Sequence, residues 1–554
     1  MAGDEKMSIA GRTHLTQPIL PRRQFLRGGA TLGLVTMLGR PAIGQTADAT
    51  VETAHGKVRG RSAGGVQIFK GIPYAASTGG KNRFLPPQPV QPWTDIRDAF
   101  DYGPTAPQVI RTTGAPIVQP IGEDCLVLNV FTPSTDTGKG RPVMVWLHGG
   151  GWRVGSGSGI TNDGTHLAAF GDVVVVSINH RLNLFGHLQI NDPDDRFADS
   201  GNGGVLDMVA ALRWVRDNIA AFGGDPGNVT IFGVSGGGSK VAALMATPAA
   251  RGLFHKAIAQ SCSGNLRITG QEEAARRAHD LAKTLGLAKL SGQALQDVPF
   301  DRLCAALTAT APSVNAYRPI VDGRTFDRHP FDPDAPALSA HIPMIAGNMA
   351  TETTAELAHD KTNFTLDAKE VQRRLTRYLQ VDSGTTQTIL SAYRDGMKGA
   401  SPSDLLVAIT TDYQYLRNTR RMASLQARSG KAPVYSYIFN WRTPVMDGLL
   451  KSPHGSDVPF VFGTTAAAAR TLGTGADLTP MSRIMMATWT SFARTGKPDN
   501  ALIPHWPRFD DDRGATMMFG LPSRVENNPG GALRASLDRL PYYEYDMPIN
   551  FDEA

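Results

Sequence analysis

Six short segments of the chain are nearly continuous runs of apolar, mostly β-branched residues. They are RPVMVWLH (141–148), DVVVVSIN (172–179), VTIF (229–232), KAIAQS (256–261), IPMIAGN (342–348) and PVYSYIFN (433–440). Such strands are typical of a sheet that is buried on both faces, which is the usual situation of a parallel sheet. The runs alternate with helical patterns, so the sequence predicts an α/β fold.

A helical pattern separates two of these runs. Its apolar positions fall close to one helical face: Val205, Val209, Leu212, Val215 and Ile219. Gly223 and Gly224 end the helix, and strand, helix and strand in this order imply a crossover within a parallel sheet. Residues 266–310 and 355–430 are helical and more polar, and we interpret them as inserts in a single domain that spans residues 46–554.

Residues 1–45 have the pattern of an export signal. PRRQFLR (21–27) precedes the apolar stretch GGATLGLVTMLG, and small residues follow in RPAIGQTADA. Paired arginines, a short apolar core and a small-residue cleavage zone predict a twin-arginine signal peptide. The mature protein is then expected in the periplasm or outside the cell. The alternative is a disordered basic tail.

Composition excludes several classes of protein. The 554 residues contain no mature run of about 18 apolar residues, so no integral membrane segment is expected. Residues 1–45 carry six basic and two acidic side chains, and most of the net charge of +6 lies there. Without a basic stripe interleaved with aromatics, no nucleic-acid partner is expected. Three cysteines, Cys125, Cys262 and Cys304, show no metal-ligand spacing and are expected to be free or, for two of them, paired.

One serine lies among four glycines directly after a predicted strand. GVSGG (233–237) fits the pattern G-x-S-x-G, with Ser235 at the apex of a strand–turn–helix. The apex backbone is strained, and side chains on its neighbours would clash where strand and helix approach each other. The N–H of Gly236 then lies at the positive end of the helix, where it can stabilise an oxyanion.

A second glycine-rich loop, His148 to Gly151, follows the strand at 141–148. It offers backbone N–H groups that no side chain shields, although an ordinary tight turn is the alternative. Because the ends of parallel strands meet at one edge, both loops are expected there. An activated serine also needs an acid and then a histidine, in that chain order. The residues alone leave the base open among His329, His341, His359, His454 and His505.

Nine segments, spread over most of residues 50–520, occur in one order. They are FKGIPYA (69–75), RFLPPQPVQPW (83–93), GEDCLVLNVF (122–131), WLHGGGW (146–152), INHRL (178–182), NIAAFGGDPGNVTIFGVSGGG (218–238), GLFHKAIAQS (252–261), HGSDVPFVFG (454–463) and FARTGKP (492–498). Together they resemble the type-B carboxylesterase family, which includes bacterial para-nitrobenzyl esterases and the cholinesterases. The resemblance implies an α/β-hydrolase fold: a mostly parallel central sheet, helices on both faces and helical inserts over the active site.

The resemblance also implies a catalytic triad. The family's acid lies in a Gly-rich segment after a strand, here GNMATET, which identifies Glu352. Its base lies in an H-G-x-E/D segment, which identifies His454. Ser235 is the corresponding nucleophile. Two further positions, Ser261 and Asp457, match residues that support the triad in the family.

An oxyanion hole follows from the same resemblance, with Gly150, Gly151 and Gly236 as its donors. Members of the family usually have the sequence G-E-S-A-G-G, whereas this chain has Val234 and Gly236 in place of the glutamate and the alanine. A glycine keeps its N–H, so the third donor is retained. Loss of the acid lowers the negative potential and disfavours cationic substrates.

The loop that holds the choline-binding tryptophan in the cholinesterases has no aromatic residue here. Ala106 also stands where the disulfide partner of Cys125 would be expected. Both departures argue against cholinesterase activity and predict that Cys125 is a free thiol.

The function expected from these features is acyl transfer from a small, neutral carboxylic ester to water through an acyl-serine. This chemistry needs no cofactor and no metal. The same triad could instead act on an amide, carbamate or lactone. A non-catalytic, neuroligin-like binding protein is a further alternative, although such proteins lose triad residues that are present here. The sequence leaves the oligomeric state open.

Overall fold

The computed structural model describes residues 48–109, 119–310, 316–544 and 551. The predicted signal peptide at residues 1–45 lies outside this part of the chain. None of the helices in the described ranges is both long enough and apolar enough to cross a membrane.

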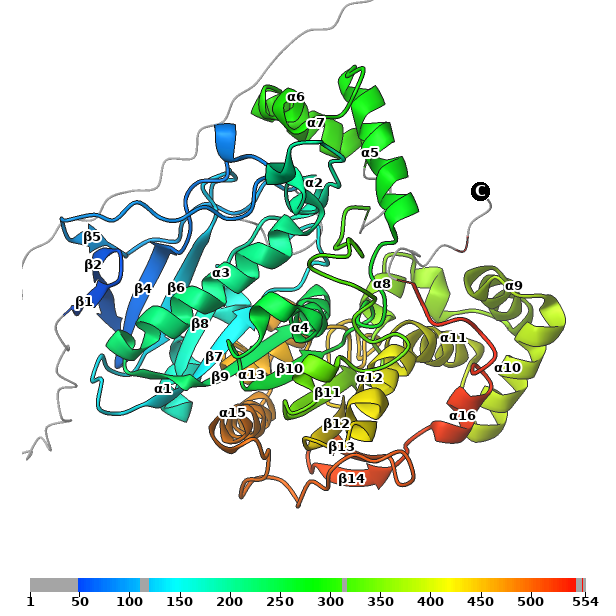
Figure 1. The fold of residues 1–554 in the computed structure, drawn as a ribbon. Helices are drawn as coiled ribbons and strands as arrows, with labels where there is room; N and C mark the ends of the chain where they lie inside the picture. The colour runs from blue at the N-terminus through cyan, green and yellow to red at the C-terminus, as the bar shows by residue number, and fades with distance from the viewer. Residues whose placement is uncertain (1–47, 110–118, 311–315, 545–550, 552–554) are drawn as a thin grey trace, which may run out of the picture. The chain divides into compact units, whose positions relative to one another are not determined.

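A mixed sheet of eleven strands forms the centre of the described chain, in the order β14-β13-β12-β11-β10-β9-β7-β8-β6-β4-β3 (Figure 1). The strands are β3 (Arg61–Ala63), β4 (Val66–Pro73), β6 (Val127–Thr132), β7 (Arg141–Leu147), β8 (Val174–Ile178), β9 (Gly224–Val234), β10 (Lys256–Gln260), β11 (Met344–Met349), β12 (Val434–Phe439), β13 (Ala515–Phe519) and β14 (Arg524–Asn527). The six predicted strands are therefore confirmed as β7 to β12. From β8 to β13 all neighbours are parallel, and antiparallel strands flank them.

A second, small sheet contains β1 (Thr50–Thr53), β2 (Gly56–Arg59) and β5 (Arg97–Asp98). The central sheet separates two apolar cores. In β7, Val143 and Val145 face one core while Met144 and Trp146 face the other, as the alternation of side chains along a strand requires.

Helices cover both faces of the central sheet, as predicted. One face packs against α3 (Gly203–Asn218), α4 (Gly236–Ala246) and α12 (Arg417–Arg428), and the other against α1 (Thr165–Gly171), α13 (Val458–Phe462) and α15 (Leu478–Thr495). Figure 1 shows α3 and α4 lying across the sheet. Helix α3 is buried on nearly all sides, and Gly223 in the left-handed region ends the 3-10 turn that follows it.

Two helical regions have small apolar cores of their own. The first contains α5 (Gln271–Leu285), α6 (Gly292–Gln296) and α7 (Phe300–Thr310), near α2 (Asn183–His187). The second contains α8 (Thr354–Leu357), α9 (Ala368–Leu379), α10 (Ser383–Gly396), α11 (Pro402–Thr411) and α16 (Gly531–Ala535). These regions lie at the top and right of Figure 1. The remaining helix, α14 (Ala469–Leu472), lies between α13 and α15 in the sequence. The extent of the two inserts stays a prediction.

Candidate active site

Ser235 lies at a sharp turn between β9 and α4, where the parallel strands end. Its φ of 57° and ψ of −122° are strained for a residue with a side chain. The residues around it must be glycine, because a side chain would clash with neighbouring backbone atoms. A Cβ on Gly233 would lie 2.5 Å from the carbonyl oxygen of Leu147, and one on Gly237 would lie 2.1 Å from it. The N–H of Ser235 donates to the carbonyl of Gln260 at 2.8 Å, which ties the turn to β10.

The glycine loop after β7 contacts this turn directly. Gly150 and Gly151 have φ values of 90° and 64°, which glycine adopts at little cost. A Cβ on Gly236 would lie 2.4 Å from the backbone nitrogen of Gly151, so the two backbones touch. Gly236 is also the first residue of α4, where the helix dipole favours negative charge. The structure thus brings the loop of Gly150 and Gly151 against Gly236, beside Ser235.

A buried lysine braces the same loop. Lys240 lies in α4, and its Nζ donates to the carbonyl oxygen of His148 at 2.7 Å. The side chain is fully buried, 5.7 Å from the centre of the Trp152 ring. Burial lowers the pKa of Lys240 well below its ordinary value. Lys240 therefore connects the helix that follows Ser235 to the first residue of the glycine-rich loop, His148 to Gly151.

Glu352 and His454 form a close pair. The Nδ1 of His454 lies 2.6 Å from Oε2 of Glu352, whose side chain is 0% exposed against 25% for the histidine. The other carboxylate oxygen, Oε1, accepts from the N–H of Met349 at 2.8 Å. Both oxygens of Glu352 are thus engaged, which fixes the orientation of the carboxylate and, through it, of the imidazole.

A carboxylate partner alone does not identify the base among the five candidate histidines. His505 also lies near a carboxylate, Asp499 at 3.0 Å, but its side chain is 80% exposed. The loop of His454 runs beside the serine turn, because a Cβ on Gly455 would lie 4.0 Å from Cγ2 of Val234. Position and burial together favour His454 as the base.

The electrostatics of His454 suit a general base. Burial lowers the pKa of His454, but the charge and hydrogen bond of Glu352, together with the charges of Asp457 and Glu356, raise it by more, so the pKa lies above its ordinary value of 6.5. The ring of Tyr415 covers the imidazole, with ring centres 4.9 Å apart and planes at 41°. Tyr415 belongs to a buried π-helical turn, Asp412–Leu416, between α11 and α12.

Asp457 belongs to a buried network behind the turn. Its Oδ2 accepts from Gln260 Nε2 at 2.7 Å and from the hydroxyl of Tyr437 at 2.8 Å. Burial raises the pKa of Asp457 to about 6. Since Gln260 also accepts from the N–H of Ser235, the network reaches the nucleophile. By contrast, Ser261 Oγ is buried without a hydrogen-bond partner in the described part of the chain.

Sequence reasoning missed four residues of this site: Lys240, Gln260, Tyr415 and Tyr437. A lysine inside the apolar pattern of α4 was a usable signal, since a buried ammonium must find an acceptor. Gln260 stood out as the polar residue at the end of β10. Tyr415 and Tyr437 gave no signal, because aromatic residues in helices and strands usually only pack.

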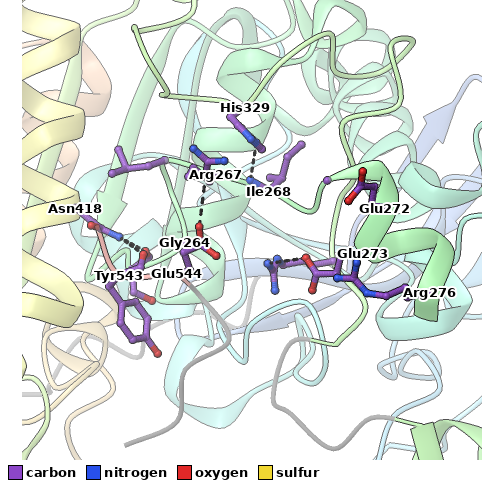
Figure 2. Close-up of a pocket in the computed structure, with 14 residues that line it drawn as sticks. Gly264, Arg267, Ile268, Glu272, Glu273, Arg276, His329, Asn418, Tyr543 and Glu544 are labelled. Carbon is purple, nitrogen blue, oxygen red and sulfur yellow. Dashed lines mark hydrogen bonds and ion pairs between the residues drawn. The ribbon is translucent and has the colours of Figure 1, made fainter. Parts of the chain in front are cut away.

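A pocket of about 230 Å³ lies nearby and is lined by none of the predicted site residues (Figure 2). Two of its lining residues, Ser263 and Gly264, follow β10 closely in the sequence. Two of its three arginines, Arg267 and Arg318, have carboxylate partners. Arg267 lies 2.7 Å from Asp332 and 3.7 Å from Glu544, as Figure 2 shows in part. The charges of this pocket are therefore largely compensated.

The sequence was compared with families and individual proteins. Residues 47–532 match the Carboxylesterase family. The para-nitrobenzyl esterase of Bacillus subtilis is 34% identical over 499 residues, which cover 88% of this chain and 98% of that protein. The phenmedipham hydrolase of Pseudarthrobacter oxydans is 34% identical over 488 residues, or 84% and 94% of the two chains.

Solved structures agree with these matches. The crystal structure of the Geobacillus stearothermophilus carboxylesterase EST55 has a TM-score of 0.78 and 37% sequence identity, and the match covers 88% of this chain and 99% of that one. A structure of PNB esterase has a TM-score of 0.74 at 34% identity, with the same coverage. Both the fold and the family expected from the sequence are thereby confirmed. The chain belongs to the carboxylesterase family and is a serine carboxylic ester hydrolase with an α/β-hydrolase fold.

Proposed function

We propose that Ser235, His454 and Glu352 form the catalytic triad of this carboxylesterase. The observation that carries the proposal is the 2.6 Å contact of His454 with the buried Glu352, on a loop that runs beside the strained turn of Ser235. In acylation, His454 Nε2 takes the hydroxyl proton as Ser235 Oγ attacks the ester carbonyl carbon. His454 then gives this proton to the leaving alcohol as the bond between the carbonyl carbon and the alkoxy oxygen breaks.

Three amides are suited to the negative oxygen of the tetrahedral intermediate. The N–H groups of Gly150, Gly151 and Gly236 would donate to it, and one such donor typically contributes about 3 kcal/mol to lowering the barrier. Deacylation repeats the sequence with water as nucleophile. His454 takes a proton from water, the acyl–oxygen bond to Ser235 breaks, and the serine recovers its proton while the carboxylic acid leaves.

We further propose a neutral ester as substrate. Val234 beside the nucleophile is buried and apolar, so it places no negative charge next to the reacting serine. Asp457 and Ser261 are proposed to support the triad from behind, Asp457 through Gln260. A carbamate is the second candidate substrate, because the phenmedipham hydrolase relative is compatible with it.

Labelling of the serine tests the triad. A fluorophosphonate probe should label the purified protein, and Ser235→Ala should abolish the label together with hydrolysis of p-nitrophenyl esters. Continued labelling of Ser235→Ala would assign the nucleophile to another residue. A panel of aryl esters of graded acyl length, run beside matched N-aryl carbamates, then decides between the two substrate classes by kcat/KM.

We also propose that residues 1–45 direct export by the twin-arginine route. The paired Arg22 and Arg23 before a short apolar stretch support this. Replacing both by lysine should leave the precursor in the cytoplasmic fraction of a host that carries the twin-arginine machinery. A variant found in the periplasm as efficiently as the parent protein would contradict the proposal.

A further inference from the structure

A cavity of about 250 Å³ lies between α12 and α16, apart from the predicted triad. Four arginines line it and define what we call the arginine pocket: Arg417, Arg420 and Arg421 of α12 and Arg534 of α16. The positions on α12 are spaced three and four residues apart, which places them on one side of the helix. Tyr542, 40% exposed, also lines the cavity, so it is open to solvent.

Three arginines of this pocket, Arg417, Arg420 and Arg534, lack carboxylate partners. Arg417 and Arg534 are each only 7% exposed. Arg417 donates to the backbone carbonyl of Leu540 at 3.0 Å, and Arg534 donates to the side-chain oxygen of Asn528 at 3.3 Å. Arg420 lies over an aromatic ring instead of an acceptor. None of the three forms an ion pair within the residues that the structure describes.

The acidic residues that face the pocket do not balance this charge. Asp511 and Asp538 line it, and Oδ2 of Asp511 is already engaged by Arg428 at 2.6 Å and by Ser424 at 2.9 Å. Asp412 is buried close by, where it accepts from a tyrosine hydroxyl at 2.6 Å and offsets part of the charge of Arg534 and Arg417, although it does not line the cavity. The lining therefore holds four guanidinium groups against two carboxylates.

Mutual repulsion is a second sign of uncompensated charge. Burial lowers the pKa of Arg420, the neighbouring charge of Arg534 lowers it further, and the charge of Asp511 offsets only part of this shift. Burial also lowers the pKa of Arg417. In the pocket of Figure 2, by contrast, two of the three lining arginines, Arg267 and Arg318, lie 2.7 Å and 3.6 Å from carboxylates. An excess of buried positive charge is costly unless an anion joins it.

We propose that the arginine pocket is a binding site for a doubly charged oxyanion of the phosphate type. A dianion matches the difference between four arginines and two aspartates in the lining. Guanidinium groups bind phosphate oxygens through paired N–H donors, which favours a tetrahedral oxyanion over a halide. Because α12 packs on the sheet and α16 on α10, the bound anion would hold the second helical region against the sheet.

Calorimetric titration of the whole purified protein with inorganic phosphate tests the site, with sodium chloride and succinate titrated at matched ionic strength. Phosphate should bind saturably, with one anion per chain, and more tightly than either comparison anion. Arg420→Gln should weaken phosphate binding by about tenfold or more, the usual effect of losing one charge-assisted contact. Equal heats for phosphate and chloride, or equal affinity for succinate, would overturn the proposal.

Arg374→Gln is the matched control. Arg374 is also a largely buried arginine, 11% exposed, but it has a carboxylate partner, Glu370 at 2.8 Å. Its replacement should leave phosphate affinity unchanged, and an equal loss in both variants would overturn the proposal. Ester hydrolysis by Arg420→Gln should match the parent and reports that the variant is folded.

A measurement on the unaltered protein covers the case in which Arg420→Gln does not fold. Phenylglyoxal modifies accessible arginines, and phosphate should slow its reaction at the half-buried Arg420 and Arg421. The reaction at Arg216, an exposed arginine paired with Asp217 at 2.7 Å, should not change. Protection that is absent, or equal at all three arginines, would reject the site.

Discussion

Replacing Glu352 by glutamine should disable the base while leaving the shape of the site intact. Both oxygens of Glu352 accept hydrogen bonds, Oε1 from the N–H of Met349 at 2.8 Å and Oε2 from Nδ1 of His454 at 2.6 Å. Glutamine offers only one oxygen. If that oxygen faces His454, the amide NH₂ faces the N–H of Met349 and two buried donors oppose each other. If it faces Met349, the NH₂ points at Nδ1 and forces the proton onto Nε2.

The second arrangement should prevail, and it is inactive. An unsatisfied buried donor costs about 1–3 kcal/mol, so the productive orientation falls to between roughly one part in 5 and one part in 150. Loss of the carboxylate also removes its attraction for the imidazolium, about 4 kcal/mol for charges 4 Å apart at an effective dielectric of 20, or roughly a thousandfold. Together the two effects predict a fall in kcat of about 10³- to 10⁵-fold, in the range typical of a disrupted triad.

The assay is kcat and KM for a p-nitrophenyl ester across pH, together with the second-order rate of fluorophosphonate labelling. In the parent protein kcat/KM should fall as the pH drops through the pKa of His454, which lies above 6.5 because Glu352 raises it. In Glu352→Gln the fall of the residual kcat/KM should move to a lower pH, because the pKa of His454 drops when the carboxylate is lost. A variant that keeps more than about one-tenth of the parent kcat would refute the orientation argument.

Three further changes have defined outcomes. Gly237→Ala should cost about 3 kcal/mol or more of unfolding free energy in denaturant titration, because its Cβ would lie 2.1 Å from the carbonyl oxygen of Leu147. Lys240→Met should lower kcat about 10- to 100-fold with little change in KM, because the carbonyl of His148 loses its donor and the proposed oxyanion amides of Gly150 and Gly151 are held less firmly. Asp457→Asn should stabilise the fold at pH 8 by up to about 3 kcal/mol but not near pH 3, since the raised pKa of about 6 means that ionisation of this carboxyl opposes folding as pH rises.

Each of these changes has a matched comparison. Gly270→Ala should be nearly neutral, because nothing lies within 4 Å of a Cβ there. Lys240→Arg, which keeps a donor, should recover part of the loss, and a Lys240→Met enzyme with unchanged kcat would remove the lysine from the mechanism. A pH-independent effect of Asp457→Asn on stability would show that burial does not raise the pKa of this carboxyl.

Patterns along the chain were sufficient to predict the architecture and the strained turn of Ser235. Nearly continuous apolar runs predicted strands β7 to β12, because a strand buried on both faces must be apolar throughout. The four glycines near Ser235 predicted the strained turn, since only glycine fits where Gly237 meets the end of β7. These features depend on residues close together in the sequence, so the residue types at those positions are enough to predict them.

The pairing of His454 with Glu352 is a property of the tertiary structure. Five histidines satisfied the chain order, and the residues themselves gave no reason to choose His454, which lies 102 positions from Glu352. The same holds for the contact of Lys240 with His148 and for the arginines that meet between α12 and α16. Burial and charge compensation depend on which distant segments pack together, and a single sequence does not record those distances.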